Sequence, residues 1–137
     1  MIKFVDLSRE FKQLKNKLIN DFIKVGLSGQ YVNGKNLKKF EKIFSKFIGV
    51  KYCVGVSSWT DGAILVFKAM GLHKNTEVIT TSNSFIASCG AIIASGLKPV
   101  LVDVDETYNT NLKIIKKSVS KRTKVIMPIY PYGRIPE

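Results

Sequence analysis

The sequence predicts an α/β protein in which a mostly parallel β-sheet lies between two layers of helices, as a three-layer sandwich. From Val50 onward, short apolar runs alternate with stretches of helical periodicity. The runs are apolar at nearly every position, which is typical of parallel strands buried on both faces. Right-handed crossovers between such strands place their carboxyl ends along one edge of the sheet, where the ligands of these sheets bind.

The first 49 residues predict two amphipathic helices. Apolar residues recur at helical spacing between lysines from about Ser8, a possible cap, and this helix is expected to end before Gly26. Its stripe consists of Phe11, Leu14, Leu18, Phe22 and Val25. A second stripe closes at Gly49, which suits a helix C-cap. It consists of Leu37, Phe40, Phe44 and Phe47. We therefore expect a helical segment over residues 1–49 and a β/α core over residues 50–137, both in one domain.

The core is expected to contain four strands with helices between them. The strands are expected at residues 52–56, 77–80, 99–104 and 123–127. Three helices are expected between them. The first runs to Met70 and is closed by Gly71, the second runs from about Ser84 to Ser95, and the third begins near Asn111.

The segment Ser57–Asp61 is the most informative junction, because it connects a predicted strand to a predicted helix. Such a junction points free backbone N–H groups and the positive end of a helix dipole at one place, which suits a phosphate or another small anion. Thr60 is the expected N-cap, with Asp61 in the first turn. Residues 81–85 follow a second strand and are expected at the same edge. Many α/β junctions of this kind bind nothing, so the junction alone identifies no ligand.

The formal net charge of +12 suggests an anionic partner, but its distribution argues against nucleic acid. The chain has few arginines, namely Arg9, Arg122 and Arg134. Bidentate arginine and exposed aromatic residues dominate base recognition, whereas lysines cover the outward faces of the predicted helices here. A solvated lysine-rich surface is the simpler interpretation. A small basic α/β module that binds nucleotide or nucleic acid remains an alternative, which a salt-titrated binding assay tests.

The sequence provides no metal motif, secretion signal or membrane span. Cys53 and Cys89 lie in apolar segments and are expected as buried free thiols, and His73 is expected in a solvated turn. The segment Met1–Arg9 has no apolar core of a signal peptide, and no apolar stretch is long enough to cross a bilayer. We expect a cytoplasmic protein without membrane insertion.

An ordered set of short motifs resembles the N-terminal portion of the DegT/StrS-type aminotransferase family along essentially the whole chain. The motifs lie at residues 4–7, 29–34, 40–41, 49–51, 57–62, 77–80, 82–88, 99–104, 123–128 and 132–134. The resemblance implies the N-terminal part of the large domain of a fold-type I transferase that uses pyridoxal 5'-phosphate (PLP). It implies an aminotransferase acting on nucleotide-linked keto sugars in amino-sugar or surface-polysaccharide biosynthesis. The amino donor would be glutamate and the complete enzyme a homodimer.

The resemblance also assigns cofactor-binding residues. Thr60 and the backbone of Trp59 would hold the cofactor phosphate, and Phe85 would lie against the pyridine ring, although core packing is an equally simple role for Phe85. Tyr31 would lie near the mouth of the active site or the neighbouring subunit.

The sequence departs from the family pattern in two ways. Trp59 stands where the family has glycine, so a positive φ there would strain the loop, and Gly62 stands where the family has a small non-glycine residue. In addition, the lysine that forms the Schiff base and the carboxylate that faces the pyridine nitrogen are expected after Glu137. We therefore expect no catalytic residue in these 137 residues, which would be an N-terminal piece that is inactive alone. A family branch that dehydrates sugars with the same cofactor, using histidine in place of the lysine, remains open.

Overall fold

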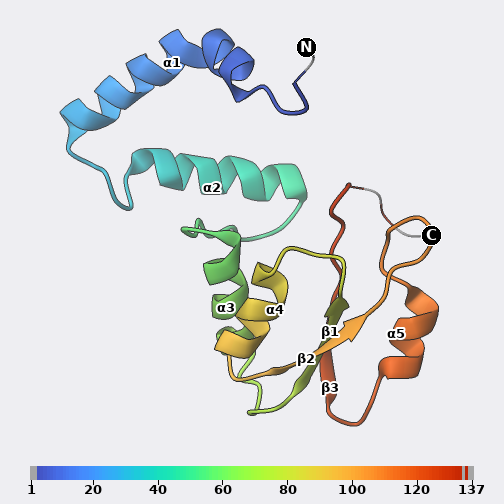
Figure 1. Cartoon of the computed structure of the whole chain (residues 1–137). Helices are drawn as coiled ribbons and strands as arrows, with labels where there is room; N and C mark the ends of the chain where they lie inside the picture. The colour runs from blue at the N-terminus through green and yellow to red at the C-terminus, as the bar shows by residue number, and fades with distance from the viewer. Residues whose placement is uncertain (1–2, 134, 136–137) are drawn as a thin grey trace. The chain divides into compact units, whose positions relative to one another are not determined.

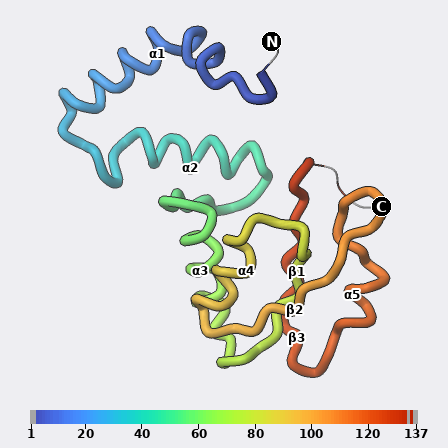
Figure 2. The backbone as a smooth tube through the Cα atoms, viewed as in Figure 1, coloured from blue at the N-terminus to red at the C-terminus, as the bar shows by residue number. Residues whose placement is uncertain are grey.

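The computed structural model describes residues 3–133 and 135. Arg134, the last residue of the motif at 132–134, lies outside the described residues. The chain divides into two compact units, Met1–Gly55 and Val56–Glu137, and its path through both is traced in Figure 2. The two units are described separately. The division predicted between residues 49 and 50 stays a prediction.

The first unit consists of helices α1 (Leu7–Ser28) and α2 (Lys35–Ile48) (Figure 1). The predicted cap of α1 is wrong, because the carboxylate of Asp6 accepts the hydrogen bond from the Arg9 N–H at 3.2 Å. The predicted end before Gly26 is also wrong. A helix interior tolerates glycine at a cost of about 1 kcal/mol, and α1 continues until Gly29 takes the left-handed conformation at φ 64°.

Helix α2 ends at Gly49 as predicted, with φ 79°. The Glu41 Oε1 accepts a hydrogen bond from the backbone N–H of Gly55 at 2.8 Å. A Cβ at position 55 would lie 2.6 Å from Cδ1 of Leu37, so a side chain there would collide with α2. Glu41 and Gly55 therefore fix the segment that follows α2 against the helix.

The apolar stripes of both helices are mostly exposed: neither α1 nor α2 contains a buried residue, and only Val25 and Leu37 of the stripes are half-buried. Among the exposed side chains are Phe11, Leu14, Leu18, Phe22, Phe40, Phe44 and Phe47. An apolar surface of this extent favours association. We expect the purified 137-residue chain to self-associate, which sedimentation velocity over a range of concentrations would detect. A dilute monomer with one sharp unfolding transition would contradict this prediction.

The second unit is an α/β structure with a parallel sheet, as the sequence predicts, but the sheet has three described strands and not the four predicted ones. The sheet order is β2 (Lys98–Val102), β1 (Glu77–Thr81), β3 (Thr123–Met127). The helices are α3 (Trp59–Ala69), α4 (Ala87–Ala94) and α5 (Leu112–Ser118). Helix α5 begins after Asn111 as predicted, since the Asn111 side chain accepts hydrogen bonds from the N–H groups of Lys113 and Ile114.

Helices cover both faces of this sheet, which gives the predicted three layers (Figure 1). On one face, Val78 of β1 packs with residues of α3, α4 and the segment after α4, namely Phe67, Ala91, Ile92 and Leu97. On the other face, Ile79 packs with Val102 of β2 and Ile115 of α5. Adjacent residues of the central strand thus belong to separate cores, because strand side chains alternate between the faces of a sheet.

The predicted strand at residues 52–56 is wrong. This segment has no regular structure, and the side chains of Tyr52 and Val54 are 74% and 75% exposed. A strand needs a neighbour for its backbone hydrogen bonds, and none of the described strands pairs with it.

Smaller differences from the predictions concern the ends of two elements and the burial of the two cysteines. Helix α4 begins at Ala87 rather than near Ser84, and β2 ends at Val102 rather than Val104. Cys53 and Cys89 are free but only half-buried. Within the described ranges, no helix combines the length and the apolar character that crossing a membrane requires.

Candidate functional site

The N-terminus of α3 forms the first part of the candidate site. Its cap is Ser58 and not the predicted Thr60, because Ser58 has extended backbone angles and its Oγ accepts from the Asp61 N–H at 3.1 Å. Thr60 is instead the second residue of the helix.

Asp61 lies in the first turn, as predicted. Its carboxylate accepts hydrogen bonds from the hydroxyl groups of Ser57 at 2.5 Å and Ser58 at 2.9 Å. These bonds, Ser57 first and Ser58 second, lower the pKa of Asp61 against the opposing effect of desolvation. The carboxylate stays ionised, which is favourable at the positive end of a helix.

Two backbone donors at this helix end remain available to an anion. The N–H of Asp61 binds Ser58 Oγ, and the N–H of Gly62 binds the Ser58 carbonyl at 3.0 Å. In the part of the chain that the structure describes, the N–H groups of Trp59 and Thr60 donate to no protein atom. A helix N-terminus with free donors is suited to a phosphate.

The two departures from the family pattern cause no strain here. Trp59 is the first residue of α3 and is not among the described non-glycine residues with positive φ, so the strained loop considered in the sequence analysis does not occur. At Gly62 a Cβ would lie 3.2 Å from Cγ2 of Val56, closer than most Cβ contacts. Glycine at position 62 therefore accommodates the valine that precedes the junction.

A cavity of about 410 Å³ brings the three predicted site residues together. Its lining comes from the start of α3, the segment after β1, the start of α4 and the segment after β3. The lining residues are Trp59, Thr60, Phe85, Ala87, Ser88 and Ile129. Phe85 is 79% exposed and is therefore not part of either core of the second unit. The cavity combines an apolar wall with a helix end that has free backbone donors.

The sequence analysis did not assign Ser88 and Ile129 to the site. Ser88 follows β1 and Ile129 follows β3. Their positions after the carboxyl ends of strands were the sequence signal that could have assigned them to the site.

Tyr31 belongs to the first unit, where it is 71% exposed and its hydroxyl donates to the Gly26 carbonyl at 3.5 Å. His73 is exposed in a turn, as predicted. The described residues contain no cluster of metal-ligating side chains.

The fold and the site define an α/β protein in which a helix end with two free backbone donors lies beside an exposed aromatic side chain, near the carboxyl ends of parallel strands. Residues 12–137 match the model of the DegT/DnrJ/EryC1/StrS aminotransferase family. The chain belongs to this family.

Several of the similar proteins are named as sugar aminotransferases. The chain is 33% identical over 135 residues to the UDP-2-acetamido-2-deoxy-3-oxo-D-glucuronate aminotransferase of Pseudomonas aeruginosa, covering 98% of this chain and 38% of the relative. It is 37% identical over 135 residues to the dTDP-3-amino-3,6-dideoxy-alpha-D-galactopyranose transaminase of Aneurinibacillus thermoaerophilus, covering 98% of this chain and 37% of the relative. The chain thus spans less than two fifths of the length of these relatives.

Solved structures share the fold. The crystal structure of DesV from S. venezuelae superposes with a TM-score of 0.94 at 29% identity, covering 99% of this chain and 37% of DesV. The structure of NtdA from Bacillus subtilis, described as carrying the bound cofactor PMP, superposes with a TM-score of 0.93 at 30% identity, covering 99% of this chain and 32% of NtdA.

Proposed function

We propose that this chain forms part of a PLP-dependent aminotransferase that transfers an amino group to a nucleotide-linked keto sugar. The observation that carries the proposal is the cavity in which Trp59, Thr60 and Phe85 meet. Family membership and the names of the UDP-sugar and dTDP-sugar relatives support it. Residues 1–137 would then be part of the large domain of that enzyme.

The residues of the cavity fit two parts of the cofactor. The free N–H groups of Trp59 and Thr60 and the Thr60 hydroxyl offer three donors to the phosphate, and the dipole of α3 favours its charge. The exposed ring of Phe85 offers a flat apolar surface to the pyridine ring and excludes water from that face. When bound, the cofactor carries the amino group between donor and acceptor.

The lining of the cavity binds and orients but contains no acid or base. Among the described residues it includes no lysine and no carboxylate. We propose that the covalent lysine and the carboxylate for the ring nitrogen are supplied by other residues of the complete enzyme. Glutamate as the donor, a homodimer and a cytoplasmic location are parts of the same proposal.

Binding of pyridoxamine phosphate tests the site, because this form of the cofactor has no aldehyde that labels surface lysines. We expect Thr60→Val, which keeps the shape and removes the hydroxyl, to weaken binding about tenfold in calorimetry. Thr60→Ser should retain most of the affinity. Phe85→Ala should also weaken binding, by about tenfold at most. Phe47→Ala is a matched control, since Phe47 is 80% exposed and lies on α2.

Equal affinity in all four variants, or no binding by the unsubstituted chain, would overturn the proposed site. A second readout uses PLP and borohydride reduction. We expect no single lysine of the 137-residue chain to be labelled stoichiometrically, and stoichiometric labelling together with transamination would contradict the assignment of the lysine to other residues.

A further inference from the structure

Ser88, the second residue of α4, carries a hydroxyl group that has no partner in the part of the chain that the structure describes. The residue is only 4% exposed. Other serines of this unit are paired, since Ser84 Oγ donates to the Thr81 carbonyl at 3.1 Å and Ser95 Oγ donates to the Ala91 carbonyl at 2.8 Å. A hydroxyl without a partner is unfavourable in a protein interior, so the position of Ser88 needs an explanation.

The unpaired oxygen of Ser88 faces the cavity that contains Thr60 and Phe85. Every fully buried side-chain oxygen or nitrogen of the described residues has a hydrogen-bond partner. The Ser88 oxygen has none and therefore keeps contact with an open space. Because Ser88 is almost completely buried and lines the cavity, that space is the cavity itself.

The start of α4 is a positive helix end without a counter-charge. Its cap position, Ile86, provides no side-chain acceptor, and its first turn contains no acidic residue. Within the described residues, the N–H of Ala87 donates to no protein atom. Helices α3 and α4 lie side by side (Figure 1), and the first two residues of each helix line the cavity. Two helix starts at one cavity favour an anionic group.

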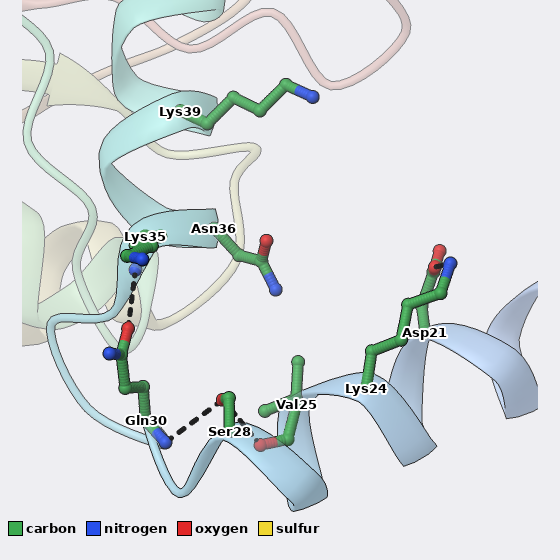
Figure 3. Close-up of a pocket in the computed structure, with 8 residues that line it drawn as sticks. All are labelled: Asp21, Lys24, Val25, Ser28, Gln30, Lys35, Asn36 and Lys39. Atoms are coloured by element: carbon green, nitrogen blue, oxygen red, sulfur yellow. Dashed lines mark hydrogen bonds and ion pairs between the residues drawn. The ribbon is translucent and has the colours of Figure 1, made fainter.

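An open hollow in the first unit lacks a buried donor of this kind. It has a volume of about 610 Å³ and lies between α1 and α2 (Figure 3). None of the residues that line it is buried, and the Ser28 hydroxyl donates to the Val25 carbonyl at 2.7 Å. Its polar side chains are therefore satisfied by water or by the chain, and nothing in this hollow requires a ligand.

We propose that the Ser88 hydroxyl donates a hydrogen bond to the phosphate of the cofactor, which is then held between the starts of α3 and α4. This bond depends on the proposed function, since it needs the cofactor in the cavity. The acceptor is a phosphate oxygen, and hydrogen bonds to an ionised acceptor are the stronger ones. A hydroxyl beside two helix starts suits the charged end of the ligand, whereas the exposed ring of Phe85 suits its flat part.

Binding of pyridoxamine phosphate to the 137-residue chain tests the role of Ser88. Ser88→Ala should weaken binding about tenfold. The fluorescence of Trp59, the only tryptophan and a residue of the cavity lining, measures the affinity. Ser95→Ala is the matched control, because it makes the same change at the other end of α4, where the hydroxyl is paired and lies outside the cavity lining. The control should leave the affinity unchanged, and equal losses in the two variants would contradict the proposal.

The ³¹P resonance of bound pyridoxamine phosphate separates contact with the phosphate from contact with the ring. This resonance should differ between the unsubstituted chain and Ser88→Ala. Weaker binding with an unchanged ³¹P resonance would place the hydroxyl at the ring and would overturn the proposal.

The stability of the ligand-free chain distinguishes a binding role from a structural one. Ser88→Ala should leave the Tm unchanged or raise it, because the hydroxyl has no protein partner to lose and alanine is the better helix former. A lower Tm would mean that the hydroxyl is bonded within the protein, which contradicts the proposal.

Thr60→Val separates this inference from the proposed function. If Thr60→Val weakens binding and Ser88→Ala does not, the role of Ser88 is wrong and the proposed function remains. If the unsubstituted chain does not bind pyridoxamine phosphate, both are wrong.

Discussion

Ile92→Ala should lower the free energy of unfolding of the second unit by about 2–5 kcal/mol. The Ile92 side chain on α4 is fully buried and packs in the same core as Phe67 of α3 and Val78 of β1. Truncation removes apolar contacts and leaves a cavity between a helix layer and the sheet. The surrounding close-packed side chains relax only in part, so the cavity remains. The cost is large because this core joins two helices to the central strand.

Ile93→Ala provides a matched control, since Ile93 is the next residue of the same helix and is 59% exposed. It should change stability by less than about 0.5 kcal/mol. Urea unfolding followed by the fluorescence of Trp59, the only tryptophan and a residue of this unit, measures both variants. Hydrogen exchange of the β1 amide groups provides a local measure. Similar effects of the two substitutions would contradict the core as described.

The sequence predicts those elements whose signals are local. The strand at 123–127 agrees to the residue, because this segment contains the apolar residues Val125, Ile126 and Met127 and is bounded by the charged residues 121–122 and by Pro128. The end of α2 agrees because Gly49 alone combines the end of the apolar stripe with a left-handed conformation. Both features depend on neighbours in the sequence and not on distant residues.

Features that depend on distant residues were not predictable. Residues 52–56 have the same apolar pattern as the true strands, yet a strand also needs a partner that the pattern does not specify. At the start of α3, residues 57, 58 and 60 all have side chains able to cap, and only backbone geometry selects Ser58.

The candidate site was predictable in part. The resemblance assigned Trp59, Thr60 and Phe85, and all three line one cavity. Ser88 and Ile129 were not assigned, because their places in the lining depend on how α4 and the segment after β3 pack. The sequence also gave no reason to expect a buried charge at Glu77, since a single acidic residue before an apolar run is commonly exposed.

Glu77 joins all three strands at the amino-terminal end of the sheet. It lies on β1, opposite Lys98 of β2 and Thr123 of β3. Its side chain is only 6% exposed. The carboxylate accepts from the Ser120 hydroxyl at 2.5 Å and from the Arg122 guanidinium at 2.8 Å, and the Lys98 ammonium lies 3.6 Å away. These partners favour the ionised form of the carboxylate over the neutral form.

Loss of this charge should therefore destabilise the sheet in a pH-dependent way. The hydrogen bond from Ser120 lowers the pKa of Glu77 below its ordinary value of 4.5, with smaller contributions from Arg122 and Lys98 that burial opposes. Because the pKa is lower in the folded state, the stabilisation is present above 4.5 and is lost as the pH falls through the lowered pKa. We expect Glu77→Gln to lower the Tm markedly at pH 7.

The difference in Tm between the unsubstituted chain and Glu77→Gln should shrink as the pH falls from 4.5 through the lowered pKa of Glu77, since the unsubstituted carboxyl then becomes neutral as well. Thermal unfolding at a series of pH values measures this convergence. Glu106→Gln, at an exposed position on the segment after β2, should leave the pH profile unchanged. A constant Tm difference at all pH values would mean that the shape of the Glu77 side chain, and not its charge, stabilises the sheet.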